Sequence, residues 1–492
     1  MENENKRLEF KGSQFMALIP FLIFIVITII LSFLKAADLN MMIGSAILGL
    51  MVGMFFAKDK GEYWNAIIKG LGSNVGMTAV LIWLIVGIYG SILKSGQIVE
   101  GLVWLSIQLG VRGAGFTIIA FLFSGIFAVA TGTSFGTIAA MGPVLYPAGL
   151  LLGCNPAVLG GAILSGSAFG DNLAPVSDTT IISATSQEYT NKDGSAEIGG
   201  VVKSRAKYAI PAGIIAVVLF GIFGGASSVQ STVAVEDILT KYTNPKGLLL
   251  LIPTVIVIYL AVKGKSIFTT ITVGIIASII IGLPAGLFTF SDLIAIENGA
   301  VTGAIPEGVA GMTTFCILLM IVVAMGNLLI ESGCMETTVD WLNEKVIKTP
   351  RDADLSIFIL STIFGILIAA INTIANICVS PFVNSIGKKN KLHPYRRADV
   401  LSGAVCSFPF FVPYGGAVLL LIGAMESVSS TYSFVTPLDP SSFFFTTFYC
   451  WALWFIMLIA CLSGWGRVLE GKGGEMVKEL PSEYKLDMKK AN

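Results

Sequence analysis

Long apolar runs separated by short polar stretches make up almost the whole chain. Two examples are "MALIPFLIFIVITIILSFL" at 16–34 and "CILLMIVVAMGNLLI" at 316–330. A helix needs about 20 mainly apolar residues to cross the hydrocarbon core of a bilayer. The pattern therefore predicts an all-α, polytopic membrane protein.

Hydropathy, together with helix-breaking residues, predicts about fourteen crossings. They are 15–34, 41–57, 75–93, 113–130, 137–152, 157–185, 207–224, 246–262, 267–287, 308–330, 354–370, 374–387, 397–425 and 441–463. Two amphipathic segments, 98–110 and 335–347, are expected to lie at the membrane interface.

The composition agrees with this interpretation. Of the 492 residues, 54% are hydrophobic and 13% are charged, against about 25% charged residues in soluble proteins. The formal net charge of zero gives no indication of nucleic-acid binding. The seven cysteines form no CxxC pair, so we expect buried apolar thiols and no resident cofactor. His393, the only histidine, is expected in a solvated basic loop.

The positive charges test the number of crossings. With the N-terminus in the cytoplasm, the predicted inner segments hold 26 of the 31 Lys and Arg residues. Cytoplasmic loops carry an excess of Lys and Arg. The distribution therefore predicts an even number of crossings, with both termini cytoplasmic and no Lys, Arg or His in the interior of a span.

Two segments of the first half resemble segments of the second. "YGSILKSGQIVEGLVWL" (89–105) resembles "MGNLLIESGCMETTVDWL" (325–342), and "AVLGGAILSGSAFGD" (157–171) resembles "ADVLSGAVCSFPFF" (398–411). Each half holds seven predicted crossings, so the second copy would enter the membrane upside down. We expect a first repeat at 1–245 and an inverted second repeat with a cytoplasmic tail at 246–492, as in secondary transporters. A chance match of small residues is the alternative.

Four predicted helix breaks fall at corresponding places in the halves. They are "TGTSFGT" (131–137), "FGDNLAPVSDTT" (169–180), "INTIAN" (371–376) and "SFPFFVPYGGA" (407–417). Non-helical backbone at membrane depth is tolerated only where it lines a cavity or is buried in protein. The breaks therefore mark the candidate site.

Asp171 lies near the middle of the crossing at 157–185, which Gly170 and Pro175 are expected to break. An acidic residue there costs about 2.5–3.5 kcal/mol on insertion scales. The acid is therefore protonated, faces water or binds a cation; a neutral Asp171 hydrogen-bonded to backbone is the structural alternative. Asp178 or Ser177 is expected to cap a second helical piece.

Hard oxygen ligands near the breaks favour a cation of the alkali or alkaline-earth type. They are Thr131, Thr133, Ser134, Ser167, Asn172, Ser177 and Thr179. Asn372 and Asn376 are four residues apart, hence on one helical face, and can add oxygens from the second half. Polar packing between helices would explain some of these residues equally well.

The first two breaks carry a family resemblance. "TGTSFGT" followed by "GGAILSGSAFGDNLAPVSDTTIIS" resembles the signature of the NhaC-type sodium/proton antiporters, a family that includes exchangers of malate for lactate. The resemblance implies a multi-pass protein of the bacterial plasma membrane, with sodium ions and protons as its partners. It also implies that Asp171 and Asp178 bind sodium and protons, with Thr133, Ser134, Ser177 and Thr179 as candidate ligands. Asn172 stands where family members usually carry His or Lys, which leaves the stoichiometry open.

Alternating access with a proton- and cation-exchanging Asp171 is the hypothesis for function, and Na+/H+ antiport is its favoured form. The alternative is a sodium- or proton-coupled exchanger of small organic acids or amino acids. Its candidate solute-binding residues are Asn372, Asn376, Phe408, Phe410, Phe411 and Tyr414. No HExxH or GxSxG motif indicates an enzyme. The oligomeric state, including a homodimer, stays open.

Overall fold

The computed structural model describes residues 7–34, 39–175, 177–225, 243–263, 265–297, 299–368, 372–429 and 431–479. The helices of the first half are α1 (Ile19–Phe33), α2 (Leu39–Gly53), α3 (Lys60–Leu71), α4 (Asn74–Ser95), α5 (Ile98–Gln108), α6 (Ala114–Thr131), α7 (Ser134–Leu151), α8 (Pro156–Leu173), α9 (Asp178–Thr185) and α10 (Ile198–Phe223). The expected helical class is confirmed.

The second half is also helical. It contains α12 (Leu251–Val262), α13 (Ile267–Ala285), α14 (Phe290–Leu293), α15 (Ala304–Glu331), α16 (Cys334–Lys345), α17 (Pro350–Leu367), α18 (Asn372–Lys389), α19 (Pro394–Val405), α20 (Gly416–Ser429) and α21 (Phe448–Ser463). Five 3-10 helices are interspersed: η1 (Gln14–Leu18), η2 (Met54–Phe56), η3 (Pro245–Leu250), η4 (Phe408–Phe410) and η5 (Pro440–Phe443). Two short antiparallel hairpins pair β1 (Ala295–Glu297) with β2 (Ala300–Thr302) and β3 (Leu469–Glu470) with β4 (Met476–Val477).

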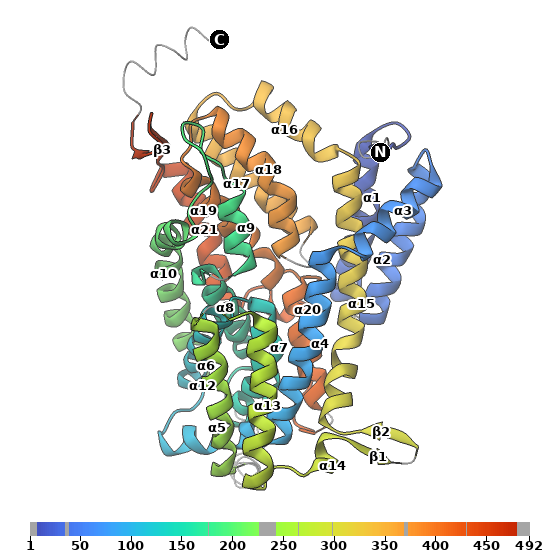
Figure 1. Cartoon of the computed structure of the whole chain (residues 1–492), viewed down its shortest axis with the longest axis vertical. Coiled ribbons are helices and arrows are strands. Elements are labelled where there is room, and N and C mark those ends of the chain that lie inside the picture. Colours follow the sequence, from blue (N-terminus) through green and yellow to red (C-terminus); the bar gives the residue numbers. More distant parts are fainter. Residues whose placement is uncertain are drawn as a thin grey trace.

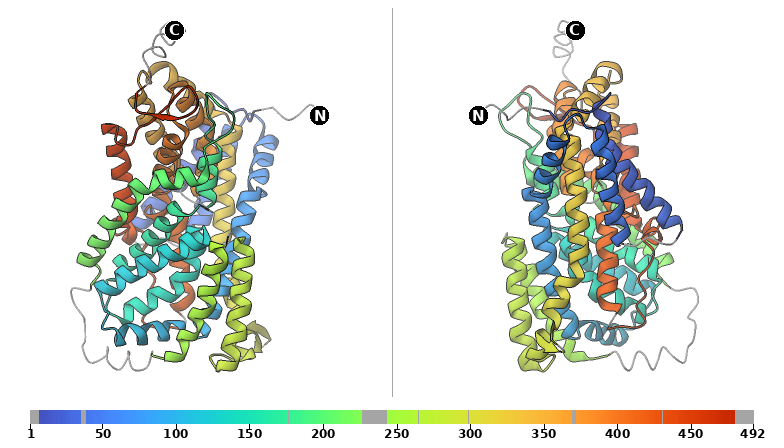
Figure 2. Two further views of the ribbon diagram at one scale, coloured as in Figure 1. Left: turned by 60° about the vertical axis from the view of Figure 1, so that its left-hand side comes forward. Right: turned by 90° about the vertical axis from the view of Figure 1, so that its right-hand side faces the viewer.

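The helices form an elongated bundle with two distinct ends (Figure 1). One end holds α3, α16 and the hairpin β3–β4, and the other holds α5, α14 and the hairpin β1–β2. The two views of Figure 2 agree: the start of blue α1 and the red C-terminal hairpin lie at the same end, away from the yellow-green β1–β2. The first and last described elements therefore share one end of the bundle.

By length and composition, seven helices among the described residues are apolar enough to cross a membrane, and five shorter apolar helices accompany them. Several predicted crossings correspond to broken pairs, because 157–185 contains both α8 and α9, and 397–425 contains both α19 and α20. The segment 58–69, interpreted as a loop, forms most of α3, which Asp59 caps by accepting from the backbone N–H groups of Gly61 and Glu62. The predicted amphipathic segments are helices α5 and α16.

The order of elements in the two halves corresponds. Helix α4 ends at Ser95 and is followed by the short α5, as α15 ends at Glu331 and is followed by the short α16. The pair α6 and α7 has its counterpart in α17 and α18, and α8 and α9 theirs in α19 and α20. In Figure 1, α4 runs toward the end with α5, whereas α15 runs the opposite way, toward α16. Helices α4 and α15 thus run in opposite directions.

Two expectations about basic residues are wrong. His393 is buried, not solvated: it caps α19, its Nδ1 accepts from the backbone N–H of Tyr395, and its Nε2 lies 3.3 Å from the carbonyl of Gly474. Burial lowers the pKa of His393 to about 4. A basic residue also lies inside a helix. Helix α10 begins at Ile198 rather than near 207, so it contains Arg205, and this residue is buried.

Candidate ion-binding site

Four helix ends meet around Asp171. The residue lies in the last turn of α8, and its side chain is buried, with 3% of the residue exposed. The first turns of α7 and α9 supply Ser134 and Thr179, and the first residue of α18, Asn372, reaches it from the second half of the chain. Three of the predicted breaks therefore converge on one carboxylate.

Four side chains donate hydrogen bonds to this carboxylate. Ser177 Oγ lies 2.7 Å from Oδ1, and three donors approach Oδ2: Ser134 Oγ at 3.3 Å, Asn372 Nδ2 at 3.3 Å and Thr179 Oγ1 at 3.4 Å. Hydrogen bonds to an ionised acceptor are stronger than those between neutral groups. This arrangement therefore favours a carboxylate that carries its negative charge, and the three hydroxyl oxygens stand within reach of a cation bound to it.

The local sequence explains how Ser134 reaches Asp171. Gly132 ends α6 in the left-handed region with φ of 67°, where a residue without a Cβ is favoured. Thr133 then caps α7, and its hydroxyl accepts from the backbone N–H of Gly136. Ser134 is the first residue of α7, and its side chain is left to donate to Asp171.

The break that follows Asp171 comes later than the sequence predicted. Gly170 does not end α8, which continues to Leu173, so the break lies around Pro175. Gly170 instead allows close packing, because a Cβ there would lie 2.1 Å from the carbonyl oxygen of Gly125 in α6. Gly166, one turn earlier, meets the carbonyl of Phe121 in the same way, at 2.2 Å. The glycines bring α8 into backbone contact with α6.

The second helical piece begins as predicted, but its cap does not form. Ser177 is the N-cap residue of α9, yet its hydroxyl donates to Asp171 and lies 2.8 Å from Thr179 Oγ1 instead of capping the helix. Asp178 is the first residue of α9, where a negative charge is favourable. Its side chain is exposed, and it makes no hydrogen bond or ion pair with the described residues. The structure therefore separates the two aspartates by environment.

Two asparagines near Asp171 carry buried oxygens without a hydrogen-bond partner among the described residues. Asn172 donates to the hydroxyl of Tyr449 at 3.2 Å, and Asn376 donates to the carbonyl of Asn372 at 2.9 Å, but Oδ1 of both is unpaired. A buried polar atom without a partner costs about 1–3 kcal/mol. A cation or a water molecule would satisfy such oxygens.

Three other candidate ligands are engaged elsewhere. Thr131 Oγ1 donates to the carbonyl of Phe127 at 2.9 Å, and Ser167 Oγ donates to that of Ile163 at 2.8 Å. Thr133 is occupied as the cap of α7. The structure thus brings Ser134, Ser177 and Thr179 to Asp171, but not these three.

A buried arginine, Arg205, contacts residues next to the site, and the sequence did not predict its position there. Arg205 donates to Thr180 Oγ1 at 3.0 Å, to Ser183 Oγ at 2.9 Å and to the carbonyl of Asn172 at 3.5 Å. None of the ion pairs among the described residues includes Asp171. Arg205 therefore fixes α9 against α8 without neutralising the carboxylate by direct contact.

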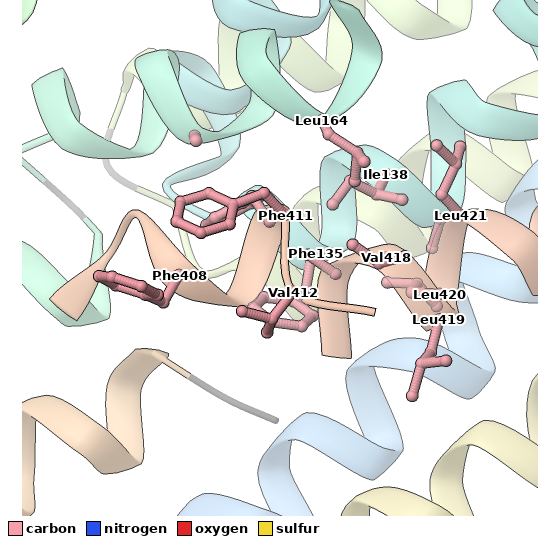
Figure 3. Packing of buried hydrophobic residues seen from close by; sticks show 14 of the residues in the cluster. Phe135, Ile138, Leu164, Phe408, Phe411, Val412, Val418, Leu419, Leu420 and Leu421 are labelled. Carbon is pink, nitrogen blue, oxygen red and sulfur yellow. The ribbon is translucent and has the colours of Figure 1, made fainter. Parts of the chain in front are cut away.

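The aromatic candidates of the second half are buried against other side chains, and Tyr414 lines a small cavity of about 10 Å3. Phe411 stacks on Trp451 with ring centroids 4.3 Å apart, and Phe410 lies 6.1 Å from Phe135. Figure 3 shows Phe408 and Phe411 packed among apolar side chains such as Leu164 and Val412. Tyr414 is also buried, and its hydroxyl donates to the carbonyl of Ile366 at 3.2 Å. This break is filled by aromatic rings.

The described part of the chain shows no cluster of the side chains that usually hold a transition metal. No three His, Cys, Asp or Glu side chains gather there. Around Asp171 a single carboxylate is instead surrounded by hydroxyl and amide groups, a set that suits hard cations.

Comparison with known proteins gives matches that include this site. The model of the Na+/H+ antiporter family matches residues 8–222. The Malate-2H(+)/Na(+)-lactate antiporter of Bacillus subtilis is 25% identical over 362 residues, which cover 69% of this chain and 74% of that protein. The Na(+)/H(+) antiporter NhaC of Alkalihalophilus pseudofirmus is 25% identical over 318 residues, covering 60% of this chain and 67% of that protein.

Among solved structures, the YdaH transporter of Alcanivorax borkumensis aligns over 92% of this chain and 99% of its own, with 12% identity and a TM-score of 0.41. The sequence matches confirm the family resemblance, and the relatives named here are antiporters.

Proposed function

We propose that this chain, which resembles the Na+/H+ antiporter family over residues 8–222, exchanges sodium ions for protons at Asp171. The observation that carries the proposal is a buried carboxylate that receives hydrogen bonds from Ser134, Ser177, Thr179 and Asn372 but has no ion-pair partner among the described residues. Sodium would bind Asp171 together with the hydroxyl oxygens that now donate to it.

Exchange would result from competition between a sodium ion and a proton for the carboxylate of Asp171. Burial favours the neutral form of a carboxylic acid, whereas a bound cation favours the charged form. A proton and a sodium ion therefore exclude each other at Asp171. When sodium binds, the hydroxyl groups would rotate so that their oxygen lone pairs face the ion. The amide oxygens of Asn172 and Asn376, which have no partner among the described residues, are candidates for further ligands.

Alternating access would follow from the two halves of the chain, which we propose to be inverted repeats at 1–245 and 246–492. The opposite directions of α4 and α15 support this arrangement, as do the matching orders of helices. Asn372 belongs to the second half and Asp171 to the first, so relative motion of the halves would change their contact. Fourteen crossings and cytoplasmic termini remain part of the proposal.

Exchange of an organic solute is the alternative function, and it is supported by a relative rather than by the geometry of the site. The malate/lactate antiporter is a relative, but the aromatic residues suggested for a solute are packed against other rings. We therefore propose sodium and proton as the transported pair, with exchange of malate, lactate or amino acids as an outcome that a solute panel would reveal.

The experiment is sodium-driven proton flux in proteoliposomes. Asp171→Asn keeps the size of the side chain but removes its charge, and we expect exchange to be abolished while the purified protein elutes from size exclusion like the wild type. For the wild type, each unit of pH decrease in the range where the proton competes should raise the half-saturating sodium concentration by about tenfold, by mass action. Sodium-dependent proton flux in the Asn variant would overturn the assignment.

A further inference from the structure

A second polar cavity lies away from Asp171. It has a volume of about 300 Å3 and is formed by α4, α7, α15 and α20. Its polar lining comes from Ser91, Lys94, Glu307, Glu426 and Ser427. Lys94 lies in the last turn of α4 and Glu307 in the first turn of α15, toward the end of the bundle that holds α5 and the hairpin β1–β2 (Figure 1). No predicted site residue lines it.

Lys94 places a buried positive charge in this cavity. The residue is 7% exposed, and its Nζ lies 3.2 Å from the carbonyl oxygen of Ser427 and 3.5 Å from Oε2 of Glu307. An ammonium group has three N–H donors. Two of them therefore have partners among the described residues, and the contact with Glu307 is at the long limit for a hydrogen bond.

Ser91, one helical turn before Lys94, supplies a second donor. Its hydroxyl is buried, the residue is 9% exposed, and the oxygen has no hydrogen-bond partner among the described residues. Residues at i and i+3 lie on the same face of a helix. A carboxylate in the cavity can thus accept one hydrogen bond from the remaining N–H of Lys94 and one from Ser91.

The rim of the cavity has the opposite charge. Glu307 and Glu426 are exposed there, so carboxylates stand at the rim while Lys94 lies inside. A dicarboxylate would be repelled by this rim, whereas an ammonium group would be attracted to it. The volume is at the lower end of the range for small-molecule pockets.

We propose that this cavity binds a small zwitterion, a molecule with one carboxylate and one ammonium group such as a free amino acid. The carboxylate lies against Lys94 and Ser91, and the ammonium group donates to Glu307. The site is independent of Asp171, although α7 lines both: Ala139 and Pro143 face the cavity, and Ser134 contacts the carboxylate.

Three molecules of similar size separate the contributions of the two charges. L-alanine carries both groups, L-lactate replaces the ammonium group by a hydroxyl, and ethylamine lacks the carboxylate. We expect isothermal titration of the full chain in detergent to show saturable binding of L-alanine and at least tenfold weaker binding of the other two. L-lactate binding as tightly as L-alanine would overturn the proposal, as would the absence of saturable binding for glycine, L-alanine and L-lysine alike.

Two matched serine variants locate the binding. Ser91→Ala removes a hydroxyl that has no partner among the described residues, so the variant should fold, and we expect about tenfold weaker L-alanine binding from the lost hydrogen bond to a charged group. Ser427→Ala is the control, because its hydroxyl already donates to the carbonyl of Ala424 and its own carbonyl is retained. Equal L-alanine affinity in wild type and Ser91→Ala would place the ligand elsewhere and contradict the proposal.

Asp171→Asn distinguishes this proposal from the exchange mechanism. We expect that variant to lose sodium/proton exchange but to keep L-alanine affinity. Ser91→Ala should show the reverse, with exchange retained in the absence of amino acid. Loss of L-alanine binding in Asp171→Asn would show that zwitterion and cation share one site, and would overturn a separate cavity.

Discussion

The helix breaks at 169–180 and 407–417, which we expect to correspond in the two halves, have opposite chemistry. Around Asp171 the break is polar, and each oxygen of the carboxylate accepts at least one hydrogen bond. At η4 the break is aromatic, and Phe408, Phe410 and Phe411 fill it. Irregular backbone at membrane depth must either line a cavity or be buried in protein. The first break is suited to an ion, and the second shows that a break is not by itself a binding site.

The largest effect is expected at the aromatic break. Phe411→Ala removes a buried ring that stacks on Trp451, and such truncations cost about 3–5 kcal/mol of stability. We expect a clearly lower melting temperature in detergent. The half-saturating sodium concentration of the protein that stays folded should change by about twofold or less, because none of the hydrogen bonds to Asp171 comes from Phe411.

Phe445→Ala is the matched control for stability, because that side chain is 77% exposed and its loss leaves no cavity. A strong shift in sodium affinity with Phe411→Ala would show that the aromatic break takes part in ion binding. The contrast between the two breaks would then fail.

A smaller but more specific effect is expected at the polar break. Ser177→Ala removes the shortest hydrogen bond to Asp171, at 2.7 Å, and a proposed sodium ligand. Hydrogen bonds to charged groups contribute about 1.5–3 kcal/mol, so the half-saturating sodium concentration in proteoliposomes should rise by about tenfold or more.

Ser407→Ala is its counterpart at the second break, where the hydroxyl donates to the carbonyl of Gly403 at 2.9 Å within its own turn of helix. Its sodium affinity should stay close to that of the wild type. Equal effects of the two serine variants would mean that both breaks contribute alike.

The smallest effect is expected from the second aspartate. Asp178 is exposed and has no hydrogen bond with the described residues, so Asp178→Asn removes only a screened charge near Asp171, worth about 1 kcal/mol or less. We expect at most about a fivefold change in sodium affinity, measured by the same flux assay. Complete loss of exchange would make Asp178 an equal partner, as the family resemblance implies.

Much of the helical order followed from the sequence, because apolar length and breaker residues are local properties. The starts of α7 and α15, for example, lie within four residues of the predicted 137 and 308. The end of α8 was misjudged because Gly170 was interpreted by its backbone freedom. Its actual role, contact with Gly125 of α6, depends on a neighbour that is distant in sequence.

Only part of the site could be predicted, because some of its contacts follow from local sequence and others depend on residues distant in sequence. Ser134 and Ser177 adjoin helix breaks that the sequence marks with Gly and Pro, and they reach Asp171. Arg205 and Lys94 lie outside the predicted spans at 207–224 and 75–93, because a hydropathy pattern ends a span at a charged residue and does not recognise one inside a helix. Their partners, Thr180 and the carbonyl of Ser427, are visible only in three dimensions.

The glycine contacts between α8 and α6 determine which parts of the molecule are free to move. With Gly166 and Gly170 against the carbonyls of Phe121 and Gly125, these two helices cannot slide past each other without a steric clash, so they form one stationary frame that carries the carboxylate. Under the proposed exchange, exposure of the ion to one side or the other would then depend on α7 and α18, the helices that bring Ser134 and Asn372. The ion would stay in place while its gates change around it.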